Sequence, residues 1–262
     1  MKSILLSVLI GLVLTDCPSI KYVEGGLSWN GWAGKSWECC KPNCAWTSVA
    51  GKGNECKVCD TNGNIIPDGN AKCHCEGGQA TTCLSQVPFT ESGCSNIGFA
   101  FAIVPFPDPS ICGKCFEFTF TGQGRYETLL NQKKLKGKKL IVMASNIELD
   151  AQEGRFDILI PGGGDGINLN GHCYDIFGSN TGSKIGGLLT SCENEVGWGI
   201  PEEQIYTGRK QCLSQKCNSV FSNNTQAKKG CLFLADFLEA ATAPLVTYRE
   251  VECPTQLKSK YK

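Results

Sequence analysis

Three carboxylates occupy places in the sequence where their side chains could be held in fixed positions. Glu38 lies between a tryptophan and two adjacent cysteines, so its backbone should be held rigidly beside an aromatic surface. Asp150 and Asp157 lie seven residues apart around a turn that leads into an apolar run. Most acidic side chains are only solvated surface groups. Carboxylates fixed beside aromatic rings, however, suit cleavage of a glycosidic bond, which needs an acid to protonate the leaving oxygen and a base to deprotonate water.

Tryptophan is concentrated around the first of these carboxylates. Four tryptophans lie within 18 residues, namely Trp29, Trp32, Trp37 and Trp46. Flat aromatic rings can stack on the faces of sugars, but large aromatic side chains are also common in protein cores. We therefore expect at least two of the four to be core residues.

Other kinds of site find less support. The pairs Cys56/Cys59 and Cys112/Cys115 have CxxC spacing, which in an exported chain indicates structural disulfides rather than zinc or redox chemistry. The 2 histidines lie far apart, and no HExxH or Gly-x-Ser-x-Gly motif is present. The glycines of 162–166 fit neither a phosphate loop nor a dinucleotide loop and predict a tight turn that a bulky substrate could approach. We expect no metal ion and no cofactor.

The first 15 residues have the pattern of a secretory signal peptide. Lys2 precedes an apolar run from Ile4 to Leu14, which is too short to span a bilayer. Val13 and Thr15 suit the −3 and −1 positions, so we expect cleavage after Thr15. The alternatives are a cut after Ser19 and a buried N-terminal helix.

Export implies an extracellular protein. Since the number of cysteines, 18, is even, we expect them to be paired in disulfides. The one Asn-x-Thr glycosylation sequon is at Asn223. Lys plus Arg and Asp plus Glu both number 25, so the net charge of zero gives no electrostatic reason to bind nucleic acid or an anionic membrane. No linker or repeat interrupts residues 16–262, so we expect a single catalytic domain, monomeric and without a separate carbohydrate-binding module.

Short apolar runs separated by turns predict a β-rich domain. Alternating phenylalanines over 116–120 indicate a strand, and further strands are expected at 140–143, 158–160 and 246–251, with a short helix at 98–103. Residues 39–94 are dense in Cys, Gly, Asn and Asp and read as loops pinned by disulfides. This order favours a β-barrel over alternating strands and helices.

Two segments resemble signatures of the glycoside hydrolase family 45 endoglucanases. Residues 37–46, Trp-Glu-Cys-Cys-Lys-Pro-Asn-Cys-Ala-Trp, are similar to the family's Thr-Arg-Tyr-Trp-Asp-Cys-Cys-Lys-Pro-Ser-Cys. Residues 155–167, Arg-Phe-Asp-Ile-Leu-Ile-Pro-Gly-Gly-Gly-Asp-Gly-Ile, resemble its His-Phe-Asp, apolar run and Pro-Gly-Gly-Gly. With a third block over 230–254, the resemblance covers roughly residues 27–257.

The resemblance implies a mainly β fold, a six-stranded double-psi β-barrel with long disulfide-tied loops and a few short helices. It also implies inverting cleavage of internal β-1,4 bonds in a β-glucan. Asp157 would be the general acid, Glu38 the general base and Asp150 an assisting carboxylate. The substrate-binding positions would be Trp37, Lys41, Trp46, Ser36 and Arg155.

The family's disulfides imply six pairs in this chain, namely Cys39–Cys173, Cys40–Cys75, Cys44–Cys112, Cys59–Cys83, Cys115–Cys253 and Cys192–Cys231. Short loops then favour Cys56–Cys73 and Cys212–Cys217 among the remaining cysteines, which leaves Cys17–Cys94. All 18 cysteines would be paired.

The chain departs from the family pattern around its base. Glu38 replaces an Asp and extends the carboxylate by about 1–1.5 Å. Gly34-Lys35-Ser36 replaces Thr-Arg-Tyr, and the loss of the tyrosine would leave space for a branched glucan such as xyloglucan. An altered base points to one alternative, a non-hydrolytic, expansin-like protein that binds or loosens cell walls. A disulfide-rich defence lectin is a further alternative. The sequence does not identify the glucan or explain an insertion at about 193–230.

Overall fold

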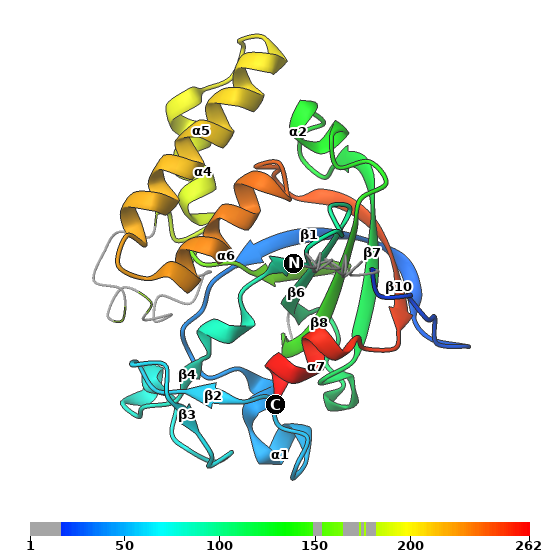
Figure 1. Cartoon of the computed structure of the whole chain (residues 1–262), viewed down its shortest axis with the longest axis vertical. Coiled ribbons are helices and arrows are strands. Elements are labelled where there is room, and N and C mark those ends of the chain that lie inside the picture. Colours follow the sequence, from blue (N-terminus) through cyan, green and yellow to red (C-terminus); the bar gives the residue numbers. More distant parts are fainter. Residues whose placement is uncertain (1–16, 149–153, 165–172, 174–175, 177–181) are drawn as a thin grey trace, which may run out of the picture.

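Six strands form a closed ring in the computed structural model, which describes residues 17–148, 154–164, 173, 176 and 182–262 (Figure 1). Each strand pairs with the next, and β9 pairs again with β6. In ring order the strands are β6 (Ile97–Val104), β8 (Lys139–Ile147), β7 (Cys115–Gly124), β10 (Pro244–Val251), β1 (Ser28–Ser36) and β9 (Arg155–Leu159). Two neighbouring pairs are parallel, β1 with β9 and β6 with β8, and the others are antiparallel.

Aromatic side chains fill the interior beside β7 and β9. The ring centroid of Phe156 lies 4.8 Å from that of Phe118, 5.8 Å from that of Phe116 and 4.9 Å from that of Tyr248. The predicted strands at 116–120, 140–143, 158–160 and 246–251 are confirmed as parts of β7, β8, β9 and β10, although Ile160 itself lies just after β9. The alternating phenylalanines therefore identified the buried face of β7 correctly.

The helix expected at 98–103 is wrong, because these residues form most of β6. The strand lies between β8 and β9 and is almost entirely buried. Gly98 is needed there, since a Cβ atom would lie 2.8 Å from the rings of both Phe233 and Phe237. A continuous apolar run has no period that separates a buried strand from a buried helix.

The loop-rich segment 39–94 contains only short elements. A small sheet consists of β3 (Ile65–Ile66), β2 (Val58–Cys59) and β4 (Thr81–Thr82), and β5 (Phe89–Thr90) extends the main sheet beside β6. One-turn helices cover α1 (Thr47–Ala50), Asn43–Ala45, His74–Glu76 and Leu84–Gln86. Outside this segment lie a one-turn helix at Pro109–Ile111, α2 (Leu130–Lys133) and the C-terminal α7 (Thr255–Tyr261).

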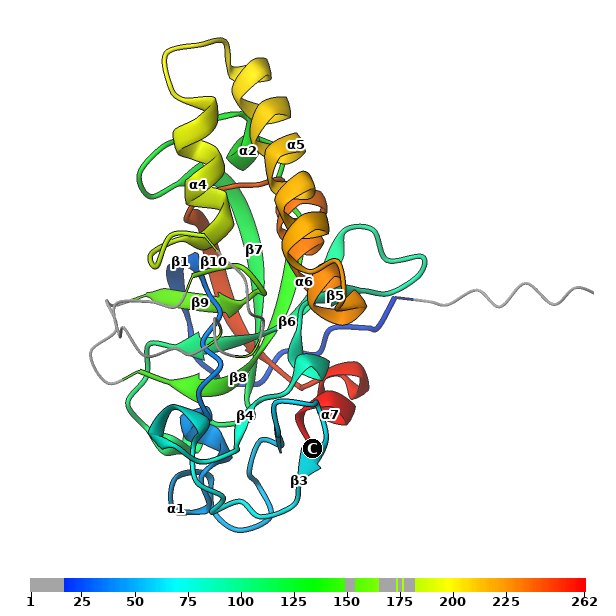
Figure 2. The same cartoon turned by 90° about the vertical axis from the view of Figure 1, so that its left-hand side faces the viewer.

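The insertion at about 193–230 forms most of a helical unit beside the ring. It consists of α4 (Gly187–Val196), α5 (Glu202–Val220) and α6 (Thr225–Asp236), and α4 and α5 run side by side in both views (Figure 2). At 19 residues, α5 is longer than the short helices expected. The Asn224 side chain accepts a hydrogen bond from the Ala227 backbone N–H and so caps α6. Asn223 is exposed in the turn before it, where a glycan would be accessible.

Eight disulfides are present, and they correct three of the expected pairs. The structure contains Cys39–Cys173, Cys40–Cys75, Cys44–Cys112, Cys59–Cys83, Cys115–Cys253 and Cys17–Cys94 as expected. Cys192–Cys231 and Cys212–Cys217 are wrong, because Cys192 pairs with Cys212 and Cys217 pairs with Cys231. Positions five apart on one helix point about 140° away from each other, so Cys212 and Cys217 cannot be bonded. Instead, one bridge joins α4 to α5 and another joins α5 to α6.

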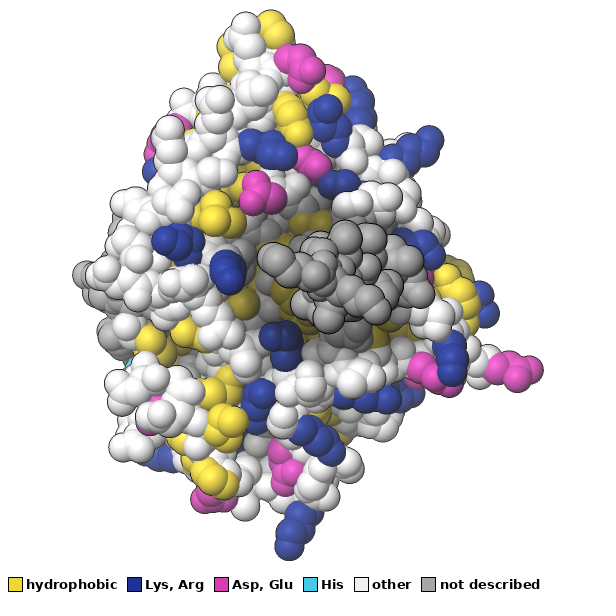
Figure 3. Space-filling view, in the orientation of Figure 1, with side chains coloured by type: hydrophobic (Ala, Val, Ile, Leu, Met, Phe, Trp, Pro, Cys, Tyr) yellow, Lys and Arg dark blue, Asp and Glu magenta, His cyan; other side chains and the backbone are white. Residues whose placement is uncertain are grey.

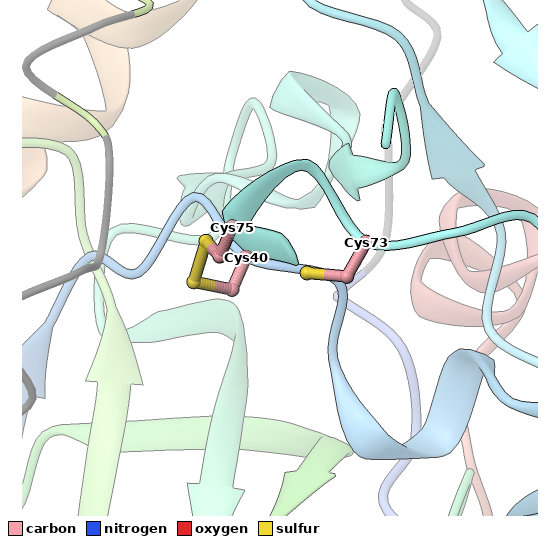
Figure 4. Close-up of side chains that lie close together, drawn as sticks. All are labelled: Cys40, Cys73 and Cys75. Atoms are coloured by element: carbon pink, nitrogen blue, oxygen red, sulfur yellow. A yellow bond between two sulfur atoms is a disulfide. The ribbon is translucent and has the colours of Figure 1, made fainter. Parts of the chain in front are cut away.

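Cys56 and Cys73 are free and buried, so the expected Cys56–Cys73 bridge is also wrong. The sulfur of Cys73 points towards the Cys40–Cys75 bridge, and the three sulfurs lie within 4.8 Å of one another (Figure 4). A disulfide offers no thiolate to a metal ion. This cluster, the one group with metal-ligand spacing among the described residues, is therefore not a metal site while the bridge is intact.

The surface agrees with a balanced charge. On the face shown in Figure 3, Lys and Arg side chains are spread among acidic, apolar and uncharged ones rather than gathered in one block. Within the described ranges, no helix has both the length and the apolar character needed to cross a bilayer. The expected signal peptide lies outside the described residues.

Candidate active site

Asp157 lies on β9 with its carboxylate almost completely enclosed. The residue is 4% exposed, and in the parallel pairing of β9 with β1 it stands opposite Gly34. Burial raises the pKa of its carboxyl group, and the charges of Arg155 and Lys35 oppose that rise. An Asp with a raised pKa keeps its proton at a higher pH than a solvated one, as a general acid must.

Arg155 holds this carboxylate with two contacts. Its Nε donates a hydrogen bond of 3.0 Å to Oδ1 of Asp157, and a guanidinium nitrogen lies 2.8 Å from Oδ2. Such a two-pronged pair fixes the plane of the carboxylate as well as its position. The expected substrate-binding residue therefore contacts the expected acid directly, two positions along the same strand.

Gly34 provides the space in which the Asp157 carboxylate lies. A Cβ atom at position 34 would stand only 1.8 Å from Oδ1 of Asp157, far inside van der Waals contact. Any other residue at this position would displace the carboxylate. Gly34, which stands where the resemblance implies a threonine, therefore leaves the room that the Asp157 carboxylate occupies.

Glu38 follows β1 on a backbone that is fixed from several sides. The Thr82 hydroxyl donates hydrogen bonds to the carbonyls of Glu38 (3.2 Å) and Cys40 (3.0 Å). The backbone N–H of Trp37 donates to the Gly164 carbonyl at 2.7 Å, and the two cysteines after Glu38 are both in disulfides. The expectation of a rigid backbone at Glu38 is confirmed, and its side chain is half-buried.

Three other predicted site residues, Trp37, Lys41 and Trp46, make contacts within the protein itself. Trp37 is 2% exposed and belongs to the core, so no sugar can stack on it in this structure. The Lys41 ammonium is buried, donates to the carbonyls of Gly69 (2.8 Å) and Ala71 (2.9 Å), and lies 3.4 Å from the ring centroid of Trp46. Through these contacts Lys41 joins the 69–71 backbone to half-buried Trp46 and so helps to hold the 39–94 loops together.

Ser36, the residue at the position of the expected missing tyrosine, is also buried. Its hydroxyl donates to the Gly164 carbonyl at 3.3 Å, and its backbone pairs with Leu159. The serine is packed against the turn of glycines 162–164. Asp150, the expected assisting carboxylate, lies outside the described residues.

Further side chains without a role predicted from the sequence lie near Asp157 and Arg155. Burial lowers the pKa of the Lys35 ammonium, and the nearby carboxylates of Glu193 and Asp157 oppose this change. Arg125 and Tyr126 lie beyond Arg155, in the loop after β7. The adjacent cation and aromatic residue at 125–126 were visible in the sequence, but nothing in the sequence places that loop beside Trp32 of β1.

Replacing Arg155 by Gln should move the pH dependence of catalysis. The Arg155 charge lowers the pKa of Asp157, so its loss leaves that pKa higher and the acid protonated up to a higher pH. A general acid governs the alkaline limb of the rate profile. We expect this limb of kcat/KM to shift to higher pH, and Arg249→Gln, which removes an exposed arginine stacked on Tyr22, should leave it in place. An unmoved or lowered limb in the Arg155 variant would contradict the assignment.

Comparison with known proteins places this geometry in context. Residues 30–260 match glycosyl hydrolase family 45. Endoglucanase B of Cellvibrio japonicus is 33% identical over 248 residues, which are 92% of this chain but 46% of that protein, so the chain spans about half of its length. An endoglucanase of the springtail Cryptopygus antarcticus is 30% identical over 244 residues, 92% of both chains. The crystal structure of a cellulase from this Antarctic springtail aligns with a TM-score of 0.67 at 29% identity, over 90% of this chain and 96% of that one.

Proposed function

Because the chain belongs to glycosyl hydrolase family 45, we propose that it is a secreted hydrolase that cleaves internal β-1,4-glucosidic bonds of a β-glucan with inversion. The enclosed carboxylate of Asp157 carries the proposal. It is held by Arg155, and its pKa is raised by burial. Asp157 would give its proton to the leaving oxygen as the glycosidic bond breaks.

Glu38 would act as the base. In an inverting reaction a water molecule attacks the opposite face of the sugar ring and loses a proton to a second carboxylate. The backbone bonds and disulfides around Glu38 support this role, because a base must meet the water in a fixed geometry. Asp150 is proposed as the assisting carboxylate from its match to the family motif alone.

The wider assignments follow the same reasoning. We propose that residues 1–15 are removed on export and that residues 16–262 act as one monomeric catalytic domain with no separate carbohydrate-binding module. The ring of six strands would be the double-psi β-barrel of the family. The expansin-like alternative is not adopted, because Glu38 keeps a carboxylate at the base position and the relatives carry endoglucanase names.

The test is hydrolysis of a panel of soluble glucans. We expect reducing ends to appear from carboxymethylcellulose, mixed-linkage glucan, glucomannan or xyloglucan, with an early fall in viscosity because internal bonds are cut. Proton NMR of the first products should show the α-anomer, the result of inversion. A purified, folded protein that releases no reducing ends from any of these glucans would overturn the proposal.

A further inference from the structure

An exposed tyrosine stands at the end of a line of side chains that begins at Asp157. The Arg155 guanidinium, which binds Asp157, lies 5.4 Å from the ring centroid of Trp32. The Trp32 ring meets the ring of Tyr126 edge-on, with 6.0 Å between centroids. Trp32 is 6% exposed, whereas Tyr126 is 68% exposed, so the line ends in a ring that faces solvent.

A cation accompanies the two rings. The Arg125 guanidinium carbon lies 5.0 Å from the ring centroid of Trp32 and 5.8 Å from that of Tyr126. Guanidinium groups donate several hydrogen bonds in one plane. An aromatic face beside such donors suits a sugar, which presents an apolar ring face and a rim of hydroxyl groups.

The backbone that carries Tyr126 is anchored on both sides. The N–H of Arg125 donates to the Ala243 carbonyl at 2.9 Å. On the other side, the Glu127 carboxylate receives hydrogen bonds of 2.5 Å and 3.3 Å from Arg209, a fully buried residue of α5. A fixed, exposed aromatic ring of this kind costs less conformational entropy on binding than a mobile one. The inserted helix α5 thereby stabilises the loop that presents Tyr126.

We propose that Tyr126 and Arg125 form a sugar-binding subsite that holds the β-glucan chain at a distance from the bond cleaved beside Asp157. A glucose ring would stack on Tyr126, and Arg125 would donate hydrogen bonds to its hydroxyl groups. This inference rests on the proposed function, since it assigns a subsite to the same substrate. Only chains long enough to extend from Asp157 past Trp32 gain from this contact.

The test compares chain lengths in variants of Tyr126. In Tyr126→Ala we expect kcat/KM for cellohexaose to fall about tenfold, near the upper end of what one aromatic contact contributes. The kcat/KM for cellotriose should stay within about twofold of the wild-type value, a change of about 0.4 kcal/mol or less, because this short chain does not extend past Trp32. Tyr126→Phe, which keeps the ring, should behave like the wild-type protein. Trp198→Ala, which removes an exposed ring in the turn between α4 and α5, is the matched control and should be unchanged.

A second measurement separates binding from turnover and from folding. In an Asp157→Asn background, calorimetric binding of cellohexaose should weaken by a similar factor when Tyr126 becomes Ala, while the thermal unfolding midpoint stays the same. Equal kinetics of Tyr126→Ala and wild type at both chain lengths would overturn the subsite and leave the proposed function intact. Equal losses at both lengths, with a lowered unfolding midpoint, would also overturn it. Absence of hydrolysis by the wild-type protein would instead contradict the proposed function.

Discussion

Asp157→Asn should lower kcat by about 10²–10⁴, the range usually lost with general acid assistance. The amide keeps the shape of the side chain and can still lie against Gly34, where only a residue without Cβ leaves room for it. It cannot release a proton to the leaving oxygen. Steady-state hydrolysis of the best soluble glucan measures the effect.

The fold should survive this change. Arg155 loses its charged partner, but its side chain is about one-third exposed and can be hydrated instead. The matched control is Asp236→Asn, because Asp236 is an exposed residue at the end of α6, and its activity should equal that of the wild type. Turnover of Asp157→Asn within a few-fold of wild type, with the same unfolding midpoint, would show that another group is the acid.

The sequence predicted the parts of the fold that local patterns determine. Alternating phenylalanines identified β7, and the apolar run 158–160 located the strand that carries Asp157. The tryptophan and cysteines around Glu38 indicated that its backbone is held in place. The sequence could not predict the directions in which the cysteines of α5 point. Cys212 and Cys217 are near in sequence but lie on different faces of α5, and only the packing of α4 and α6 on that helix shows their partners.

The burial of several predicted site residues could not be inferred from the sequence. A motif match cannot distinguish a side chain that faces the substrate from one that supports the loop behind it, and Trp37, Lys41 and Ser36 prove to be buried. Residues outside the motif were missed because strand pairing, and not a local pattern, determines where they lie. Tyr126 is brought beside Trp32 by the pairing of β7 with β10 and of β10 with β1, which no local spacing encodes.

Glu38→Gln should abolish measurable hydrolysis, a loss of at least about 10²–10⁴, while binding of cellohexaose survives. The amide has nearly the same shape as the carboxylate but cannot accept the proton of the attacking water. Calorimetry with cellohexaose and reducing-end assays on the same preparation separate the two effects. Equal, low activity of wild type and Glu38→Gln would indicate a wall-binding protein instead of a hydrolase.

Glu38→Asp tests whether the long base is adapted to this site or is damage. The Asp157 carboxylate occupies the space that a Cβ at position 34 would fill, so the acid lies where the family's threonine would not permit it. An inverting reaction needs roughly 6.5–9.5 Å between the two carboxyl groups. If the Asp157 carboxylate is displaced relative to its position in the family, the longer side chain of Glu38 can restore the required separation. The hydrogen bond from Thr82 leaves the Glu38 backbone little freedom to move and so compensate for the shorter side chain of an aspartate.

We therefore expect Glu38→Asp to lower kcat, by up to about 10² if the base is misplaced by roughly 1 Å. The loss should be largest on the glucan that the wild-type protein prefers, because that substrate positions its water for the glutamate. Rates on xyloglucan, carboxymethylcellulose and mixed-linkage glucan give the comparison. Glu203→Asp, at an exposed position in the first turn of α5, controls for shortening a glutamate away from the site. Faster hydrolysis of every glucan by Glu38→Asp would mean that the lengthened base is damage, and that Gly34 reflects only the packing of Asp157.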